Sequence, residues 1–336
     1  MNPVEQAFRR TDSLQRRIPP LAFAFAVIKK FGDDQAGGLA ALIAYYGFFS
    51  MFPLLLLLVS LLGIFLSGHP ALQREIVHSA LATFPVIGTQ ISSKAGLHQL
   101  SGNWLSAAVG AAGALWAGLG VAQAAQQAMN VVWDIPRSEW PNFIFRRLRA
   151  ALMLAILGLI FVISTFASGI GSSGALPTLL LNAAGWTVSL LLNVILFTLT
   201  FQVLTARELK WRHVFPGAAA SALAWTILQI IGGYYITHEV RSASNVYGTF
   251  ALVIGILIWI SLGAQVTLFG AEINVVWFRH LWPRSLVQPP INDGDRKVYQ
   301  GIVERARMRP EVAVSVSFTE QHSITGKQED KRRDVA

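Results

Sequence analysis

The sequence has 336 residues, of which 53% are hydrophobic and only 13% are charged, and its mean hydropathy is +0.49. Soluble domains carry nearer a quarter charged residues, so this composition excludes an ordinary soluble protein. The absence of cysteine excludes a disulfide framework, zinc–thiolate and iron–sulfur sites, and cysteine nucleophiles. The meaning of the net charge of +9 depends on where the charges lie.

The N-terminal segment, residues 1–35, is basic and lacks the short apolar core and cleavage site of a removable signal. It contains a run of apolar residues at helical spacing: Leu21, Phe25, Ile28 and Phe31. This pattern predicts a helix lying in the cytoplasmic membrane interface, with a cap packed on the bundle as the alternative.

Long windows without charged residues follow, and a crossing helix needs about 20 apolar residues. They predict an all-α, polytopic transmembrane domain over residues 36–280, with six spans at 36–66, 104–130, 150–170, 178–204, 214–237 and 246–271. The first span is longer than the roughly 30 Å hydrocarbon core. Pro53 is its candidate hinge, because proline removes one backbone hydrogen bond.

The Lys and Arg residues in the segments outside the spans predict the orientation of the protein in the membrane. The N-terminal segment, the second and fourth loops and the C-terminal piece hold 24 of the 27 Lys and Arg residues. Because cytoplasmic loops carry this excess, both termini are expected in the cytoplasm. The positive charge then signals topology and attraction to anionic lipid, with nucleic acid the minor interpretation.

Two further segments are predicted outside the spans. The external loop over residues 69–102 shows a helical period, which predicts short helices there. Residues 281–336 form a polar cytoplasmic tail that is expected to be partly disordered.

A search for chemical sites finds no metal or cofactor motif. No two of the seven histidines have the i, i+4 spacing of ligands on one helical face, and no complete nucleotide-binding glycine motif occurs. No catalytic residue, metal ligand or cofactor is therefore assigned, and the interpretation leans against an enzyme.

Polar residues within the spans are more informative, because burying them in a bilayer is costly. A candidate polar path comprises Gln123, Gln127, Asn130, Asn193, Gln202, Gln265 and Glu272. Interhelical hydrogen bonding is the structural alternative for the amides. Glu272 is expected near the cytoplasmic end of the sixth helix, where a basic partner should offset the helix dipole. The candidate partners are Arg146, Arg147, Arg149, Arg207 and Arg212.

Four sequence blocks, taken in order, resemble the YihY/BrkB family of bacterial inner-membrane proteins. They contain Asp33, Asp34, Tyr45, Tyr46 and Pro53; Trp133, Asp134 and Pro136; Pro216 and Gly217; and Tyr247, Gly248, Gly270, Glu272 and Asn274. The resemblance covers about residues 20–280 and implies six transmembrane helices. The family has carried the labels ribonuclease BN, with tRNA processing, and virulence factor.

Three functions fit these observations. The leading one is transport or translocation of a lipid or another envelope-related substrate, because polar groups line the spans. The second is a structural or regulatory envelope component without transport, and the third is a ribonuclease. The expected partners are membrane lipids, a further copy of the chain and a protein recruited by the basic tail.

Overall fold

A computed structural model describes residues 12–65, 104–152, 178–235 and 241–318, apart from residues 14, 143, 146, 287, 289 and 290. Regular structure in these residues is helical, which confirms the all-α class. The elements are α2 (Pro19–Asp33), α3 (Ala36–Phe65), α6 (Trp104–Val132), the short 3₁₀ helix η1 (Arg137–Glu139), α8 (Thr178–Leu204), α9 (Trp211–Tyr235), α10 (Arg241–Arg279) and α11 (Asp293–Arg305).

Five helices in the described ranges are long and apolar enough to cross a membrane: α3, α6, α8, α9 and α10. They correspond to the first, second, fourth, fifth and sixth predicted spans. The third predicted span and the predicted external helices lie outside the described residues, except that residues 150–152 are helical. The protein is thus a multi-span membrane protein, with five of the six expected spans seen.

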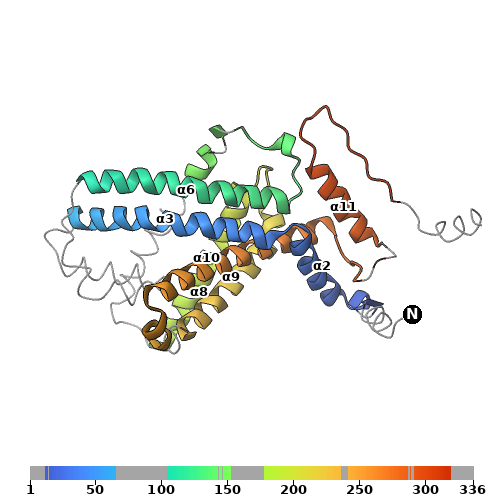
Figure 1. The fold of residues 1–336 in the computed structure, drawn as a ribbon. Helices are drawn as coiled ribbons and strands as arrows, with labels where there is room; N and C mark the ends of the chain where they lie inside the picture. The colour runs from blue at the N-terminus through green and yellow to red at the C-terminus, as the bar shows by residue number, and fades with distance from the viewer. Residues whose placement is uncertain are drawn as a thin grey trace, which may run out of the picture.

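The spans form two groups that meet at one end of the molecule. Figure 1 shows α3 and α6 side by side, while α8, α9 and α10 form a second group that diverges from this pair away from α2. Close backbone approach holds the first group together, because a Cβ atom at Gly110 of α6 would lie 2.7 Å from the backbone nitrogen of Leu57 in α3.

The second group has a still closer crossing between α9 and α10. A Cβ atom on Gly217 would overlap the carbonyl oxygen of Gly270, and one on Gly270 would overlap Ser221 Oγ. The backbone N–H of Gly217 donates to Asn274 Oδ1 at 2.6 Å. Only glycine permits this approach, and small residues are the usual means by which membrane helices pack without a hydrophobic driving force.

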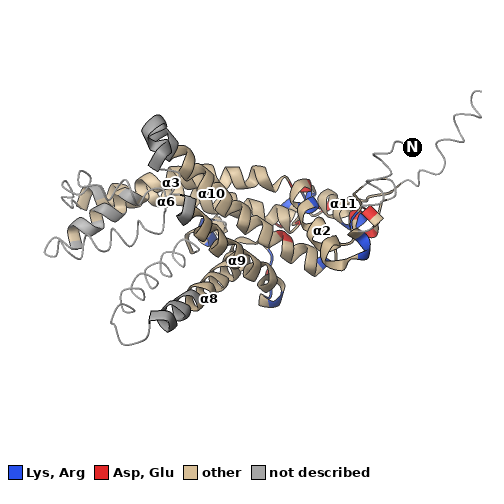
Figure 2. Cartoon of the chain, turned by 90° about the horizontal axis from the view of Figure 1, so that it is seen from below, with Lys and Arg blue, Asp and Glu red and all other residues tan. Residues whose placement is uncertain are grey.

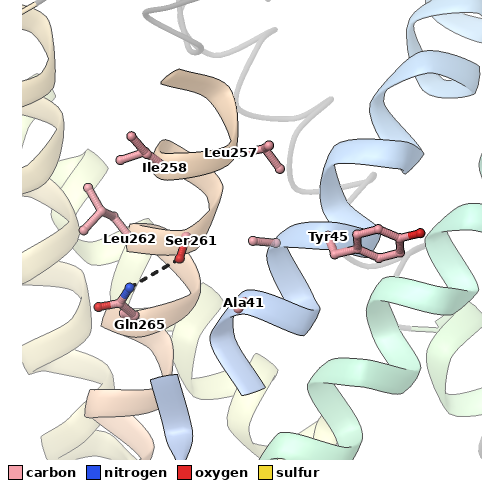
Figure 3. Close-up of a pocket in the computed structure, with 8 residues that line it drawn as sticks. Ala41, Tyr45, Leu257, Ile258, Ser261, Leu262 and Gln265 are labelled. Carbon is pink, nitrogen blue, oxygen red and sulfur yellow. Dashed lines mark hydrogen bonds between the residues drawn. The ribbon is translucent and has the colours of Figure 1, made fainter. Parts of the chain in front are cut away.

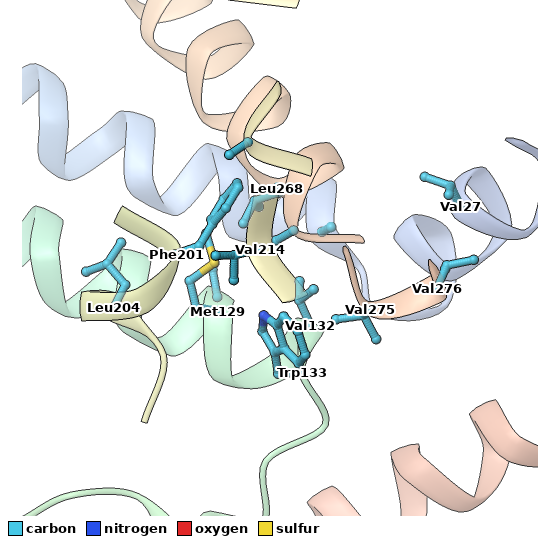
Figure 4. Packing of buried hydrophobic residues seen from close by; sticks show 14 of the residues in the cluster. Val27, Met129, Val132, Trp133, Phe201, Leu204, Val214, Leu268, Val275 and Val276 are labelled. Atoms are coloured by element: carbon cyan, nitrogen blue, oxygen red, sulfur yellow. The ribbon is translucent and has the colours of Figure 1, made fainter. Parts of the chain in front are cut away.

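The buried apolar core lies where the two groups meet, as Figure 4 shows. It joins α2, α6, α8, α9 and α10 through Val27, Met129, Val132, Trp133, Phe201, Leu204, Val214, Leu268, Val275 and Val276. Away from this junction many large side chains on the spans are exposed, for example Ile195 and Leu191 on α8. An exposed apolar surface on the spans fits contact with lipid.

Charged residues gather at the same end, around α2, α11 and the last turns of α6 and α10 (Figure 2). We call this region the charged end; the sequence predicts that it faces the cytoplasm. Two features add to the sequence expectations here. α10 continues as a helix to Arg279, beyond the predicted end of the sixth span at residue 271, and the tail that was expected to be partly disordered contains the helix α11.

Candidate functional site

The charged end is built around one lysine that is completely buried. Lys30 lies on the face of α2 that packs inward, and its side chain is 0% exposed. Its ammonium group donates to Asp34 Oδ2 at 2.5 Å. It lies 3.5 Å from Asp134 Oδ2 and 3.8 Å from Glu272 Oε2. A buried charge requires such compensation, because removal from water costs several kcal/mol.

The C-terminal end of α6 is the second feature of this cluster. Three successive carbonyl groups accept hydrogen bonds from three cations on different elements: Val131 from Arg305 at 2.9 Å, Val132 from Lys30 at 3.1 Å and Trp133 from Arg279 at 2.8 Å. Cations at this position complement the helix dipole and satisfy carbonyls that have no partner within the helix.

Asp134 closes α6 in the left-handed conformation, with φ 50°. The next residue, Ile135, returns its N–H to the carbonyl of Asn130 at 2.9 Å, as in a Schellman turn. This backbone geometry points the Asp134 carboxylate back toward the cations, and Arg279 donates to it at 2.9 Å. Aspartate tolerates this conformation better than most residues, which fits its place here.

A second set of ion pairs fixes α11 beside α2. Arg284, fully buried, donates to Asp33 at 2.6 Å and to Asp295 at 2.9 Å. Lys29 also donates to Asp295 at 2.9 Å. Arg305, at the end of α11, donates to Asp34 at 2.8 Å. The network therefore connects the tail helix directly to the base of the membrane bundle.

The electrostatic balance of the cluster follows from burial and charge. Burial alone would lower the pKa of Lys30, but the negative charges of Glu272, Asp34 and Asp134 raise that pKa above its ordinary value. Burial raises the pKa of Asp134, against the opposing effect of Lys30. Burial alone would raise the pKa of Asp295. Hydrogen bonds from Lys29 and the Ser285 backbone, together with the nearby charge of Arg284, nevertheless hold this pKa below its usual value.

Glu272 is placed differently from the sequence expectation. It lies within α10, before the helix ends at Arg279, and in the part of the chain that the structure describes it forms an ion pair with Lys30, which was not among the expected partners. Arg146, one of those partners, lies outside the described residues. Arg149 instead donates to the Thr205 carbonyl, and Arg207 pairs with Glu139. Neither carboxylate oxygen of Glu272 accepts a hydrogen bond from the residues that the structure describes.

A separate groove lies between α3 and α10. It has a volume of about 420 Å³ and is lined by Ala41, Ala44, Tyr45, Leu257, Ile258, Ser261, Leu262 and Gln265. In Figure 3 the α10 residues form one wall, while the ring of Tyr45 extends away from α10. Gln265 Nε2 donates to Ser261 Oγ at 3.3 Å, so the two polar side chains are paired on that wall.

The place of this groove along the two helices follows from its lining residues. Ala41 and Tyr45 lie in the first third of α3, which starts at Ala36, and Gln265 lies within the apolar part of α10, before Glu272 and the end of the helix at Arg279. Ile258 is 54% exposed and Tyr45 55% exposed, so the groove is bordered by side chains that are open to the surroundings. The groove therefore opens sideways between the apolar parts of α3 and α10.

The structure does not bring the candidate polar path together as one set. Gln265 lines the groove, whereas Glu272 belongs to the charged end. Asn130 is buried and accepts from the backbone N–H of Ala206 at 2.9 Å. Gln202 donates to the Leu209 carbonyl at 3.0 Å. The remaining members are Gln123 and Asn193, which are half-buried, and Gln127, which is exposed.

About half of the residues that carry the family resemblance gather in two places. Asp33, Asp34, Trp133, Asp134 and Glu272 meet at the charged end, and Gly217, Gly270 and Asn274 form the α9–α10 crossing. Others lie elsewhere: Tyr45 at the groove, Tyr46 against Gly120, and Pro53 against Gly113. Pro136 precedes η1, Pro216 lies within α9, and Tyr247 and Gly248 lie within α10.

Pro53 lies inside α3, which continues through it to Phe65. Its role as a hinge stays a prediction. Among the residues that the structure describes, no group of three or more His, Asp or Glu side chains is arranged to hold a metal ion.

Comparison with known proteins places this chain among membrane proteins. A family model described as "Virulence factor BrkB" matches residues 27–286. The putative ribonuclease-like protein YfkH of Bacillus subtilis is 23% identical over 76% of this chain and 95% of that protein. The inner membrane protein YhjD of Escherichia coli is 24% identical, over 76% and 81% respectively.

A UPF0761 membrane protein of Stenotrophomonas maltophilia, Smlt0865, is 25% identical over 82% of this chain and 65% of that protein. No solved structure matches the chain.

Proposed function

This chain belongs to the BrkB family of integral membrane proteins, and we propose that it binds a membrane lipid, or a similar envelope-related amphiphile, in the α3–α10 groove and translocates it across the bilayer. The observation that carries the proposal is the hydrogen-bonded pair Ser261–Gln265 on the wall of an otherwise apolar groove between two candidate membrane spans. Polar side chains inside a membrane span are expensive, which makes them candidates for function.

The dimensions and chemistry of the groove support this proposal. A volume of about 420 Å³ falls in the range of small-molecule sites, and such sites combine an apolar lining with a few polar groups. The apolar residues fit hydrocarbon chains, while Ser261 and Gln265 offer an uncharged hydroxyl and amide to the polar part of a passing molecule. A lipid can enter such a groove sideways without crossing water.

The test is translocation of a fluorescent lipid in liposomes that contain the purified protein. We expect protein-dependent translocation by the wild type and at least a fivefold slower rate for Gln265→Leu, which keeps the side-chain volume but removes the amide. Thr267→Val is the matched control. It also removes a polar group from α10, but the Thr267 hydroxyl donates to the Gly263 carbonyl of its own helix, away from the groove.

The control separates a specific effect from a general loss of structure. Thr267→Val should translocate within twofold of the wild type at equal protein content, and all three proteins should melt within a few degrees of one another in detergent. Rates for the wild type that equal those of protein-free liposomes would contradict the proposal. Equal rates for the wild type and Gln265→Leu would show that the groove is not the translocation path.

A structural or regulatory role without transport is the second candidate. The observation that favours it is the attachment of α11 to the bundle through Arg284 and Arg305, which could convey binding at the tail to the spans. Under this function, removing α11 would change partner capture or envelope integrity while translocation stayed at the protein-free level.

A ribonuclease role ranks third for this chain. It draws on the name of the Bacillus relative, a putative ribonuclease-like protein that is 23% identical. RNA cleavage by highly purified protein that disappears on a single carboxylate substitution, such as Asp134→Asn, would move this function to first place.

A further inference from the structure

The exposed face of α2 has no protein partner among the described residues, although it is strongly apolar. Ile18, Leu21 and Ile28 are 44%, 53% and 61% exposed, and Phe25 lies half-buried on the same side. Their spacing follows one face of a helix. The opposite face carries Ala22, Ala26, Val27 and Lys30, which are buried. A contiguous exposed stripe of large apolar side chains marks a surface that contacts something other than water.

α2 is attached to the bundle at two places, and both lie at the predicted boundary of the membrane. α2 is joined to α3 by a turn at Asp34 and Gln35, the latter with φ 52°, and the first apolar span begins immediately afterwards at Ala36. On the other side α2 packs on the last turns of α10, whose apolar span ends at Arg279. The helix is therefore held at the level where the hydrocarbon ends.

Aromatic residues at the end of α10 lie beside α2. Phe23, on the side of α2 that faces the bundle, packs edge-to-face against Trp277 and Trp282, with ring centroids 5.7 Å and 5.2 Å apart. Trp277 is 54% exposed, and the neighbouring Phe278 is 46% exposed. Tryptophan is enriched at the boundary between lipid and water, because its ring is apolar and its N–H is polar.

From these observations we infer that the apolar face of α2, with Trp277 and Phe278, is a membrane-binding surface. It lies in the lipid headgroup layer of the leaflet next to the charged end. The partner is the lipid surface itself. The exposed Arg17 beside Ile18 adds a charge suited to anionic lipid headgroups. In this arrangement α2 lies on the membrane rather than extending into water, and it holds the buried cluster of Lys30 at headgroup level.

The absence of native cysteine makes a direct test practical. Single cysteines at Leu21 and Ile28 would carry a small fluorophore in liposomes that contain anionic lipid. Each sample would be exposed separately to a lipid-borne quencher placed near the headgroups and to iodide in the water. Leu191, 57% exposed on the span α8, and Gln300, exposed on α11, give the lipid-facing and water-facing references.

The proposal expects at least threefold stronger quenching by the lipid-borne quencher at positions 21 and 28 than at position 300, together with weak quenching by iodide. Strong iodide quenching at both positions, as at position 300, would overturn it. Protection from both quenchers would also overturn it, because a protein segment or a second copy would then cover α2. A melting temperature close to that of the unlabelled protein excludes local unfolding as the cause.

Discussion

Lys30 is fully buried in the charged end, and its ammonium group lies within 4 Å of three buried carboxylates, those of Asp34, Asp134 and Glu272. Replacing it with methionine keeps most of the side-chain volume but leaves those carboxylates without their shared cation. We expect Lys30→Met to lower the free energy of unfolding by about 3–5 kcal/mol. Thermal unfolding in detergent, followed by tryptophan fluorescence, measures this change.

The matched control is an ion pair on the surface. Arg207 and Glu139 lie 3.0 Å apart, but their side chains are 52% and 42% exposed. Arg207→Ala should therefore change stability by less than about 1 kcal/mol. If the two substitutions had equal effects, the buried cluster would not be a principal determinant of stability.

Glu272→Gln should behave differently from the lysine substitution. Glu272 accepts no hydrogen bond from the described residues, and its removal as a charge leaves Lys30 beside Asp34 and Asp134. We expect a stability loss of less than about 1.5 kcal/mol, near the net value of one hydrogen bond. A loss as large as that of Lys30→Met would show instead that Glu272 is half of an essential fixed pair.

Acid should loosen the start of α11, because the contacts of that end with Lys29 and Arg284 depend on an ionised Asp295. The folded-state pKa of Asp295 lies below its ordinary value of 3.8. Its contribution is therefore complete above that value and is lost as the pH falls through the lower, folded-state pKa. A spin label at position 300 should become more mobile in this range. In Asp295→Asn the label should be mobile already at neutral pH, and a label insensitive to this substitution would contradict the account.

At the scale of single residues, sequence reasoning identified several acidic residues of the charged end but not the cations that pair with them. The motif blocks contained Asp33, Asp34, Asp134 and Glu272, but their cations were missed or assigned to the wrong loops. Arg305 meets Asp34 across 271 positions in the chain, and no local pattern reports such a distant pair. One signal was available: Lys30 is four residues before Asp34 and shares a helix face with the small Ala22 and Ala26.

At the scale of the helices, the α9–α10 crossing should be the least tolerant packing contact. Gly270→Ala places a Cβ atom where Ser221 Oγ and the Gly217 carbonyl lie, and the backbone on the other side cannot move away easily. We expect most of the variant to be lost from the folded, monodisperse fraction in detergent size-exclusion chromatography.

Gly38→Ala in α3 is the corresponding control, because a Cβ atom there meets nothing within 4 Å. It should be folded normally and gain up to about 1 kcal/mol from the better helix propensity of alanine. Normal yields for both variants would mean that α9 and α10 are farther apart than described.

The positions of the helices were the most predictable part of the fold. The fourth span was predicted at residues 178–204 and is observed as Thr178–Leu204, because its charge-free window is bounded by turn formers and by Arg207. α10 extends beyond the predicted end of the sixth span at residue 271. Glu272 and Asn274 follow that end and are polar, yet both are buried, and the helix continues past them. α11 was missed because its stability comes from long-range ion pairs rather than from a strong local pattern.

At the scale of the whole molecule, the predicted topology places the charged end in the cytoplasm. Single cysteines in the protein, which has none of its own, can report this. A cysteine at Gln300 in α11 should be inaccessible to a membrane-impermeant maleimide in intact spheroplasts and become reactive after lysis. A cysteine at Arg241, at the start of α10, should react before lysis. The reverse pattern would invert the topology.

The arrangement of the spans relative to one another was beyond sequence reasoning. Each span is apolar on nearly all sides, so its sequence does not indicate which face packs against a neighbour and which faces lipid. The divergence of the α3–α6 pair from the α8–α9–α10 group (Figure 1), and with it the groove beside Gln265, therefore emerged only from the structure.

The most direct test of the proposed function blocks the groove reversibly in one sample. Ala41, which lines the groove, would be replaced by cysteine and then modified with a bulky, membrane-permeant thiosulfonate. Lipid translocation would be measured before modification, after it and after removal of the group by a reductant. The same group on a cysteine at Leu191, outside the groove, is the control. The account predicts a rate that falls at least fivefold and recovers at position 41 alone. An unchanged rate, with complete modification confirmed by mass spectrometry, would contradict it.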